Sequence, residues 1–428
     1  MDLNRAFPYK VCINLDRRTD RWEQMRTRFE QHEIYDVRRF SAVDGQQSTV
    51  PPSWSSTPGA YGCLLSHLRI VHVARELGEP SVLIFEDDVV FDENLQEKFS
   101  SYIQQLPSDW DMLYFGALHL DDLIDISGNI HRIRRACSTY AYALNRTIYD
   151  AFIELHSRFN GPVDVLNQVL QTQHVCYCFM PHLAWVDKHF SDVQDRQKHH
   201  WYLRESLVLY GGGMDRLLAV TSLIIAYRNL TNNGTMVHNL LFLLRSYRER
   251  LPKLSVIIVE QDVESTIDNV SLPGGCQHFL LRNDGPFNKG LCFNVGMKLS
   301  NQNGEVLIFS DSDIFMEEWD IRGNVGMCQQ YDGTTGFNSL IELSGTDTVK
   351  LQDNRATLTP WFNAARYVRS GKKDAFSQYC MFTRRSIQAV GGWDEQPSKG
   401  IEPRLSAKAT RELRVFESPN DALLMHHG

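Results

Sequence analysis

Short apolar runs alternate along the chain with longer stretches in which apolar residues recur every three or four positions. The runs are bounded by turn residues, which is typical of buried parallel strands between helices. The pattern therefore predicts an α/β protein. Strands are expected at residues 10–15, 81–85, 112–115 and 139–143, and then at 220–226, 254–259, 278–281 and 306–309. Helices are expected at residues 21–32, 63–77, 237–250 and 290–299.

Two of the predicted strands run into very similar acidic sequences. VLIFEDDVVF covers residues 82–91, and VLIFSDSDIF covers residues 306–315. A strand that recurs with an acidic ending in both halves indicates two similar domains. Between them, residues 195–216 are polar, first rich in histidine and then in glycine. We therefore expect a first domain over residues 1–195, a helical linker over 196–217 and a second domain over 218–428.

Carboxylates follow both of these strands directly. Glu86, Asp87 and Asp88 end the first strand, and Asp311 and Asp313 follow the second. The carboxyl edge of a parallel sheet is where open α/β folds bind their ligands. Carboxylates at that edge can hold a divalent cation, Mn²⁺ or Mg²⁺, that also takes oxygens from a substrate diphosphate. We expect Asp87 to be among the residues that bind the diphosphate donor. The alternative is that each acidic group caps a helix or lies in a solvated turn, but the repetition favours the metal site.

The first half resembles glycosyltransferase family 25, which contains bacterial lipooligosaccharide galactosyltransferases and procollagen galactosyltransferases. The resemblance runs from about residue 11 to residue 192. It rests on VCINLDRRTDRW at 11–22, FSAVDG at 40–45, GAYGCLLSHLRI at 59–70, VLIFEDDVVF at 82–91, WDMLYFG at 110–116, TYAYALNR at 139–146 and PVD at 162–164. It implies a GT-A fold, a metal-dependent nucleotide-sugar donor and inverting transfer to a sugar hydroxyl.

The same resemblance implies roles for individual residues. Glu86 and Asp88 would bind the metal, with His189 as a further ligand. Asp164 would act as the base or orient the acceptor. The other implied residues surround the donor: Asn14, Asp16 and Arg17 near the nucleotide, and Asp44 and His67 in support of the pocket. From the residues alone, Asp16 and Asp44 could equally form turns, and His67 could be a core histidine.

The second half, from about residue 219 to residue 413, resembles family 2-like transferases, most closely the galactosyl- and N-acetylgalactosaminyltransferase type. FNKGLCFNVGMKLS at 287–300 is similar to that family's Phe-Asn-Arg-x-x-x-x-Asn-Val-Gly motif, and GGWDE at 391–395 is similar to its acceptor-side motif. The resemblance implies one metal ligand and three residues at the donor: Asp313 at the metal, Asp311 at the nucleoside, and Lys289 and Asn294 near the uracil or phosphates.

The catalytic base of the second half is where the sequence departs from that family. The usual Gly-x-Glu-Asp run is KGIEPRLS here, so Glu402 is followed by Pro403 instead of a second acid. One carboxylate suffices to remove the acceptor proton if it reaches the hydroxyl, which keeps Glu402 as the candidate base. This departure leaves open the alternative that the second domain only binds a nucleotide sugar or a glycan and is not catalytic.

Composition and charge add limits on the partners. The chain has 44 Lys+Arg and 52 Asp+Glu, a net charge of −8, which disfavours nucleic acid as a partner. Nine cysteines without a CxxC pair and a charged start indicate a reduced, cytoplasmic chain without a signal peptide. The most apolar stretch, residues 217–227, is too short to span a bilayer, so any membrane association would be peripheral.

Together these features predict a bifunctional inverting glycosyltransferase that uses nucleotide-diphosphate donors, UDP-linked, and a glycan acceptor of the lipopolysaccharide or capsule kind. Two tandem GT-A domains with Rossmann-like, mostly parallel sheets would each carry one site. Three alternatives stay open. They are a single catalytic domain beside a binding domain, sugar transfer to a modified nucleobase or a protein, and an interaction scaffold with structural metal sites.

Overall fold

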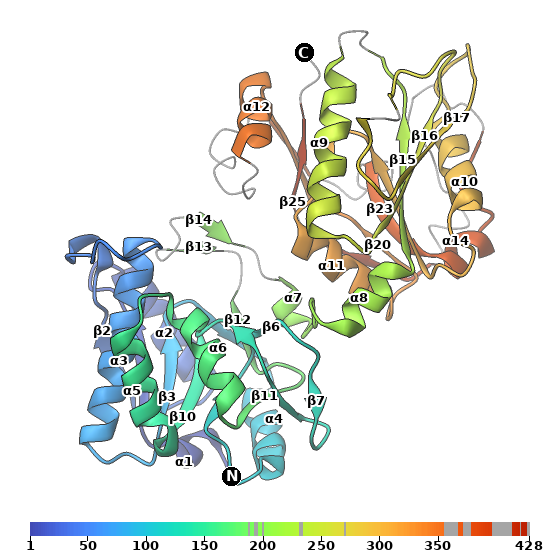
Figure 1. Cartoon of the computed structure of the whole chain (residues 1–428). Helices are drawn as coiled ribbons and strands as arrows, with labels where there is room; N and C mark the ends of the chain where they lie inside the picture. Colours follow the sequence, from blue (N-terminus) through green and yellow to red (C-terminus); the bar gives the residue numbers. More distant parts are fainter. Residues whose placement is uncertain are drawn as a thin grey trace. The chain divides into compact units, whose positions relative to one another are not determined.

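The structure is a computed structural model of the chain. It describes residues 1–186, 189–191, 196–198, 201–230, 234–268, 271–354, 367–370, 378–395, 413–419 and 421–425. The chain divides into two compact units, Met1–Gly212 and Gly213–Gly428. Each unit is a mixed α/β body built on a sheet rich in parallel strands (Figure 1). The α/β prediction is therefore confirmed, and the division falls inside residues 196–217, the segment expected as a linker.

The first unit is built on an eight-stranded sheet with the order β2-β1-β3-β10-β5-β11-β8-β7. Its strands are β1 (Lys10–Asn14), β2 (Val37–Ser41), β3 (Ser81–Glu86), β5 (Met112–Tyr114), β7 (Ile124–Asp125), β8 (Ile130–Arg132), β10 (Ala141–Asn145) and β11 (Cys176–Phe179). Its helices are α1 (Leu3–Ala6), α2 (Thr19–Gln31), α3 (Pro58–Glu76), α4 (Leu95–Tyr102), α5 (Tyr149–Arg158), α6 (Val163–Gln173) and α7 (Trp201–Arg204). Three strand pairs complete the unit: β4 (Val89–Phe91) with β12 (Ala184–Val186), β6 (Leu118–His119) with β9 (Ala136–Cys137), and β13 (His189–Ser191) with β14 (Arg196–Lys198).

Alternation along β3 explains how this sheet is covered on both faces. Val82 and Ile84 pack in the core that α3, α5 and α6 complete, whereas the Phe85 ring points to the opposite face and lies 5.4 Å from the ring of Phe29 on α2. Successive side chains of a strand point to opposite faces, so a strand buried on both sides is apolar throughout. The same alternation continues into the acidic residues that follow, and it decides which helix each of them faces.

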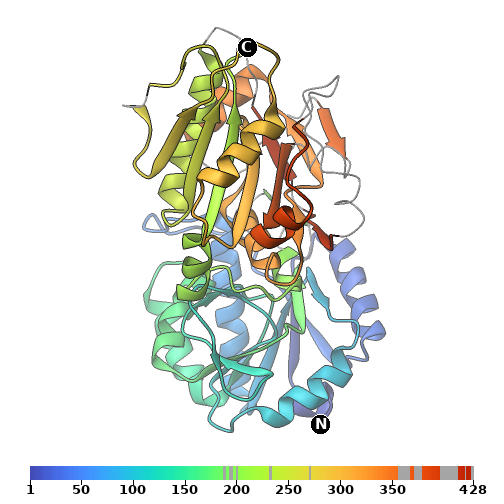
Figure 2. The ribbon, with the colours of Figure 1, turned by 90° about the vertical axis from the view of Figure 1, so that its right-hand side faces the viewer.

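The second unit has a seven-stranded sheet with the order β17-β16-β15-β18-β23-β20-β24 and a four-stranded sheet with the order β19-β25-β21-β22. The strands are β15 (Thr221–Tyr227), β16 (Ser255–Glu260), β17 (Cys276–Leu280), β18 (Val306–Asp311), β19 (Ile314–Phe315), β20 (Gly333–Thr335), β21 (Ser339–Glu342), β22 (Tyr367–Ser370), β23 (Tyr379–Thr383), β24 (Val415–Glu417) and β25 (Asp421–Leu424). The helices are α8 (Gly212–Ala219), α9 (Thr235–Arg250), α10 (Lys289–Leu299), α11 (Glu318–Met327), α12 (Gly345–Asn354) and α14 (Arg384–Ala389). Helix α9 covers one face of the large sheet and α10 covers the other (Figure 2).

The two large sheets share a central arrangement around their acidic strands. In the first unit β3 lies between the parallel strand β1 and the antiparallel strand β10. In the second unit β18 lies between the parallel strand β15 and the antiparallel strand β23. All eight predicted strands exist, but the one expected at 139–143 is β10, which runs antiparallel to both of its neighbours. Hydrophobic patterning shows that a strand is buried and does not show its direction, so this feature could not be predicted.

Three further observations concern the expected linker, the cysteines and the membrane. Residues 196–217 were expected to be helical, yet they include strand β14 as well as α7 and most of α8. All nine cysteines are free. Among the described residues, no helix is both long enough and apolar enough to cross a membrane.

Candidate functional site

A cavity of about 330 Å³ lies at the carboxyl ends of β1 and β3 in the first unit. Segments far apart in the sequence form its wall. They are residues 13–15 at the end of β1, residues 42–46 after β2, residues 56–67 at the start of α3, residues 86–88 at the end of β3, residues 138–140 before β10 and residues 162–165 at the start of α6. The cavity therefore lies where the sheet topology predicts a ligand site.

Glu86 continues the face of β3 that is covered by α3, and there it meets a buried histidine. The hydroxyl of Thr139 donates to Glu86 Oε1 at 2.6 Å, and His67 Nε2 lies 3.6 Å from the same oxygen. The other ring nitrogen of His67 is hydrogen-bonded to the hydroxyl of Tyr142 at 2.9 Å. His67 is fully buried, and its Nε2 has no hydrogen-bond partner among the described residues. The potential ligand atoms of Cys63, His67 and Glu86 all lie within 4.8 Å of one another.

Asp87 points to the opposite face, toward α2, and is held inside the protein. Arg21 Nη1 lies 2.8 Å from one of its oxygens, and Asn14 Nδ2 donates to the other at 2.7 Å. Burial raises the pKa of Asp87, and the neighbouring Arg21 guanidinium opposes that rise. The same guanidinium lies 3.6 Å from Asp88 Oδ2. Asp87 thus ties β1 and α2 to the acidic turn, while Glu86 and Asp88 line the cavity beside it.

Two glycines allow the loop after β2 to lie directly against α3. A side chain on Gly62 would meet the carbonyl oxygen of Val43 at 2.3 Å, and one on Gly45 would meet the carbonyl oxygen of Pro58 at 1.7 Å. This close approach places Asp44 at the cavity wall, where Arg17 Nε lies 3.3 Å from its Oδ2. The FSAVDG and GAYGC motifs therefore form a single packed unit of the wall.

Most residues predicted for the first site line this one cavity. They are Asn14, Arg17, Asp44, His67, Glu86, Asp87, Asp88 and Asp164. Asp16 does not line it, because its carboxylate accepts hydrogen bonds from Arg39 at 2.8 Å and from Ser41 at 2.6 Å. The bonds from Ser41 and Arg39 lower the pKa of Asp16. His189 begins β13, and its side chain lies outside the described part of the structure.

The acidic strand of the second unit ends in a comparable ion pair. Lys289, the first residue of α10, places its ammonium 2.7 Å from Asp311 Oδ1 and 3.0 Å from Oδ2. Asp311 is the last of the six residues of β18, as Glu86 is the last of the six residues of β3, so by position in the strand Asp311 corresponds to Glu86 and Asp313 to Asp88. Asp313 is buried two residues further on. Glu402 lies outside the described residues.

The side chain of Asn294 is hydrogen-bonded to the GGWDE segment. Its Nδ2 donates to the carbonyl of Trp393 and to Glu395 Oε1, both at 2.8 Å, and its Oδ1 accepts from the backbone amide of Trp393 at 2.9 Å. A side chain on Gly290 would meet the carbonyl oxygen of Asp394 at 2.2 Å. The two motifs of this half are therefore packed against each other.

Sequence reasoning missed Arg21 and Thr139, although both lie inside the motifs that carry the resemblance. Arg21 falls in VCINLDRRTDRW and Thr139 in TYAYALNR. An arginine on an otherwise polar helix looks like a surface residue until the fold brings it beside Asp87. The sequence did offer one signal, because Arg21 follows β1 closely and lies in the first turns of the next helix, near the carboxyl edge of the sheet.

The comparisons with known proteins agree with this geometry. Residues 8–167 match the model of glycosyltransferase family 25, described as LPS biosynthesis protein. This match includes every residue that lines the cavity except Val186. The fold and the cavity define the first unit as an α/β domain with a candidate ligand site at the carboxyl edge of its sheet. The N-terminal part of the chain is related to glycosyltransferase family 25.

Individual relatives are named as members of that family or as glycosyltransferases. A protein of Acanthamoeba polyphaga mimivirus, named as a glycosyltransferase, is 27% identical over 221 residues, which are 45% of this chain and 68% of that protein. Procollagen galactosyltransferase 1 of Danio rerio is 33% identical over 132 residues, 26% of this chain and 22% of that one. The inactive glycosyltransferase 25 family member 3 of Homo sapiens is 32% identical over 131 residues, with the same coverage. The chain thus spans about a fifth of the length of these two animal relatives.

Solved structures give a weaker likeness that covers about half of the chain. The catalytic domain of Drosophila β1,4-galactosyltransferase 7 with xylobiose is 13% identical, covers 47% of this chain and 65% of its own, and has a TM-score of 0.26. Glucosyl-3-phosphoglycerate synthase of Mycobacterium tuberculosis, in complex with Mn²⁺, UDP and glucosyl-3-phosphoglycerate, is 14% identical, covers 50% and 76%, and has a TM-score of 0.29. Scores this low do not define the fold of either unit.

Proposed function

We propose that the first unit is a GT-A glycosyltransferase that transfers a sugar, with inversion, from a UDP-linked donor to a hydroxyl of a glycan. The observation that supports this most strongly is the convergence of Glu86, Asp88, His67 and Asp164 on one cavity at the carboxyl edge of the sheet. These four side chains come from three separate motifs of the family 25 resemblance. A set of carboxylates and one imidazole around a single cavity is suited to a metal-assisted reaction of a diphosphate.

The residues of the cavity fit a divalent cation. His67 Nε2 is buried, has no hydrogen-bond partner among the described residues and lies 3.6 Å from Glu86, so it presents a nitrogen beside a carboxylate. We assign Glu86 and Asp88 as the ligands of Mn²⁺ or Mg²⁺, with His67 in support and His189 as a further predicted ligand. When bound, the cation would offset the charge that develops on the departing UDP.

The other side chains of the wall would bind and orient the substrates. Asp44 and Arg17, 3.3 Å apart, lie where they can direct the nucleotide, and Asn14 is fixed beside them through Asp87. Asp164 lies in the first turn of α6 and lines the same cavity. We assign it as the base that takes the proton from the acceptor hydroxyl. Asp16 would act on the nucleotide only indirectly. Arg39 donates a hydrogen bond to Asp16 and another to Asn14, which lies in the cavity wall.

We further propose that the second unit is a second GT-A domain with its own donor site, which would make the enzyme bifunctional. Asp311 would contact the nucleoside, Lys289 the uracil or phosphates, and Asp313 the metal, with Glu402 as the base. Support comes from the shared surroundings of β3 and β18 and from the matched ends of the two strands, where Glu86 and Asp311 are each the last residue and an aspartate follows two residues later. The domain limits 1–195, 196–217 and 218–428, a glycan of the lipopolysaccharide or capsule kind as acceptor, and a cytoplasmic location belong to the same proposal.

A screen of UDP-linked sugars with the full chain and Mn²⁺, reading release of UDP, tests the proposal. Asp88→Asn should lower turnover of one donor by at least about 10²-fold, because it removes a charge that acts at the developing diphosphate. Asp313→Asn should do the same for a different donor. The matched controls are Asp20→Asn on α2 and Glu249→Gln on α9, which are exposed acids outside the sites.

Each outcome of this screen decides one part of the proposal. If no UDP-linked sugar releases UDP, the assigned activity is wrong. If Asp88→Asn behaves like Asp20→Asn, the first metal assignment is wrong. If Asp313→Asn affects no donor while Asp88→Asn does, the second unit is a binding domain and the enzyme is not bifunctional.

A further inference from the structure

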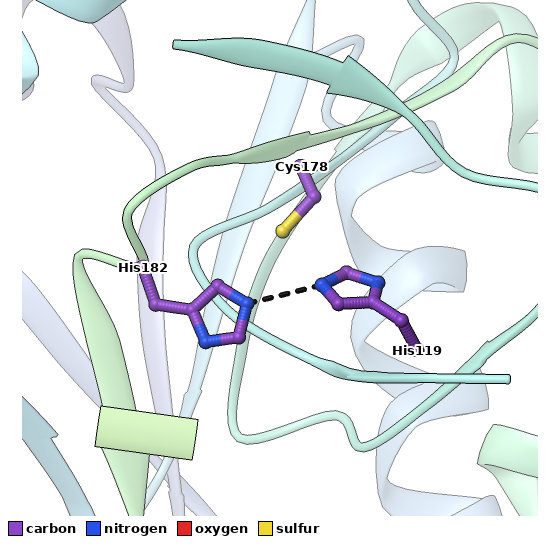
Figure 3. Close-up of side chains that lie close together, drawn as sticks. All are labelled: His119, Cys178 and His182. Atoms are coloured by element: carbon purple, nitrogen blue, oxygen red, sulfur yellow. Dashed lines mark hydrogen bonds between the residues drawn. The ribbon is translucent and has the colours of Figure 1, made fainter. Parts of the chain in front are cut away.

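Three buried side chains of the first unit form a group that is separate from the cavity (Figure 3). His119 ends β6, Cys178 lies in β11, and His182 lies on the segment between β11 and β12. The Nε2 atoms of the two histidines lie 3.0 Å apart, and the three potential ligand atoms all lie within 4.8 Å of one another. His119 and Cys178 are fully buried, and His182 is 1% exposed. None of the three lines the proposed donor cavity.

The contacts of His182 fix which of its nitrogens faces the group. Its Nδ1 lies 2.8 Å from the carbonyl oxygen of Leu203, which can only accept a hydrogen bond. Nδ1 must therefore carry the proton, and Nε2 turns its lone pair toward His119. Histidines that bind metals in proteins are oriented in this way, with the other ring nitrogen donating to a carbonyl or carboxylate.

Without a cation, His119 is poorly satisfied in this environment. Its Nε2 must then donate to His182, which leaves its Nδ1 as a buried acceptor, and Nδ1 has no hydrogen-bond partner among the described residues. Cys178 is equally short of polar contacts, since its Sγ reaches the carbonyl oxygen of Phe179, the next residue, at 3.3 Å. Buried polar atoms are rarely left in this state, and each exception calls for an explanation such as an ion.

The protonation states suit a soft or borderline metal. Burial lowers the pKa of His119 well below its usual range and that of His182 to about 4, so both rings are neutral at pH 7. Burial also raises the pKa of the Cys178 thiol, which keeps it protonated unless a cation is present. Two neutral imidazoles and one displaceable thiol proton are the ligand chemistry of Zn²⁺ sites.

We propose that His119, Cys178 and His182 bind one structural Zn²⁺ ion. Zn–N bonds of about 2.0–2.1 Å in a tetrahedral site place two nitrogens roughly 3.3 Å apart, so the 3.0 Å pair needs only a small opening. Binding forms one Zn–S bond and two Zn–N bonds. It breaks the S–H bond of Cys178, whose proton is released to solvent, and moves the ring proton of His119 from Nε2 to Nδ1, which leaves the site with one net positive charge. The fourth position would be taken by water or by His131, which lies opposite Cys178 in the β8–β11 ladder and has a buried Nδ1 without a partner among the described residues.

The place of the site in the fold gives it a structural role. It would join β6, β11 and the segment that leads into β12, which pairs with β4 directly after the acidic turn. Val186, the last residue of β12, lines the donor cavity. A zinc ion at this point would brace one wall of the cavity without touching the substrate.

The test is the zinc content of the purified full chain, measured by elemental analysis after dialysis against a weak chelator. The wild type should retain about one zinc per chain, as structural sites bind tightly. Cys178→Ser and His119→Gln should each lose nearly all of it. His156→Gln is the matched control, because His156 is also buried, bonds a backbone carbonyl through Nδ1 and lies outside the group. Asp88→Asn should keep its zinc, which separates this site from the proposed donor metal.

Cobalt substitution identifies the ligands even if a variant is unstable. Co²⁺ added to the metal-free wild type should give thiolate-to-metal charge-transfer absorption, and this absorption should be absent from Cys178→Ser and present in His156→Gln. A wild type that binds neither zinc nor cobalt in this way would overturn the proposal. So would a Cys178→Ser variant that keeps both its zinc and the absorption, or copper found in place of zinc.

Discussion

The buried pair between Arg21 and Asp87 offers a direct test of how the acidic turn is held. Replacing Arg21 by Met keeps most of the side-chain volume and removes the charge. Both residues are 8% exposed, and the guanidinium lies 2.8 Å from the carboxylate. Asp87 would keep its hydrogen bond from Asn14 and lose its counter-charge in a region shielded from water.

The expected cost of Arg21→Met is large because one partner of a buried pair is left behind. Breaking such a pair from one side typically costs about 3–5 kcal/mol. Arg26 lies on the same helix and pairs with Glu23, but both side chains are more than half exposed. Arg26→Met should therefore cost about 1 kcal/mol or less. With a urea dependence of about 3 kcal/mol per molar for a unit of this size, Arg21→Met should lower the midpoint by about 1–2 M.

The pH dependence of that cost has a definite sign. Burial already raises the pKa of Asp87 above its ordinary value of 3.8, and Arg21 opposes the rise, so the variant should have a still higher pKa. A carboxyl with a raised pKa in the folded state favours folding once it is protonated, and this gain disappears as the pH rises through that pKa. The cost of Arg21→Met should thus be greatest at pH 7 and shrink as the pH approaches 4.

The assay is hydrogen exchange of the full chain during a urea titration. Peptides from β1 and β3 report the unfolding of the first unit separately from that of the second. Arg26→Met is the control at each pH. The reasoning is refuted if the two variants lose the same stability at pH 7. It is also refuted if the cost of Arg21→Met stays constant between pH 4 and pH 7.

Two further predictions concern packing and a buried acid. Gly62→Ala should destabilise the first unit by about 1–3 kcal/mol, since the new methyl group would lie 2.3 Å from a backbone oxygen, whereas Gly161→Ala has room; thermal unfolding compares them. Glu260→Gln should cost the second unit about 1–3 kcal/mol, because Glu260 is fully buried and accepts hydrogen bonds from the loop after β16 and from His278. Burial alone raises its pKa, but these bonds outweigh it and lower the pKa below 4.5, so the advantage of the wild type is present above pH 4.5 and fades as the pH falls further. A cost of Glu260→Gln that grew on acidification would contradict this.

Much of the fold and of the first site could be predicted because the signals are local. Apolar runs such as the one in β3 mark buried strands, and the acids that follow them mark the ligand edge. The cavity then brought together residues whose motifs lie far apart, such as Asp44 and Asp164. In these cases the chemistry of a short segment and its place at a strand end were sufficient.

The parts that could not be predicted depend on contacts between distant segments. Nothing near Asp16 indicates that Arg39 and Ser41 take both of its oxygens. Likewise His119 and His182 are 63 residues apart in the sequence, and only the pairing of β6 and β11 with their neighbours brings them together. A histidine and a cysteine without regular spacing give no metal signature, so this group becomes visible only in the folded chain.

The central claim is that UDP and its cation bind at the acidic turn of the first unit, and hydrogen exchange with and without UDP and Mn²⁺ tests it most directly. The account predicts slower exchange in peptides that carry Glu86–Asp88 and Asp44. This protection should be lost in Asp88→Asn and kept in Asp20→Asn. No protection in these peptides, or equal protection in Asp88→Asn, would contradict the account.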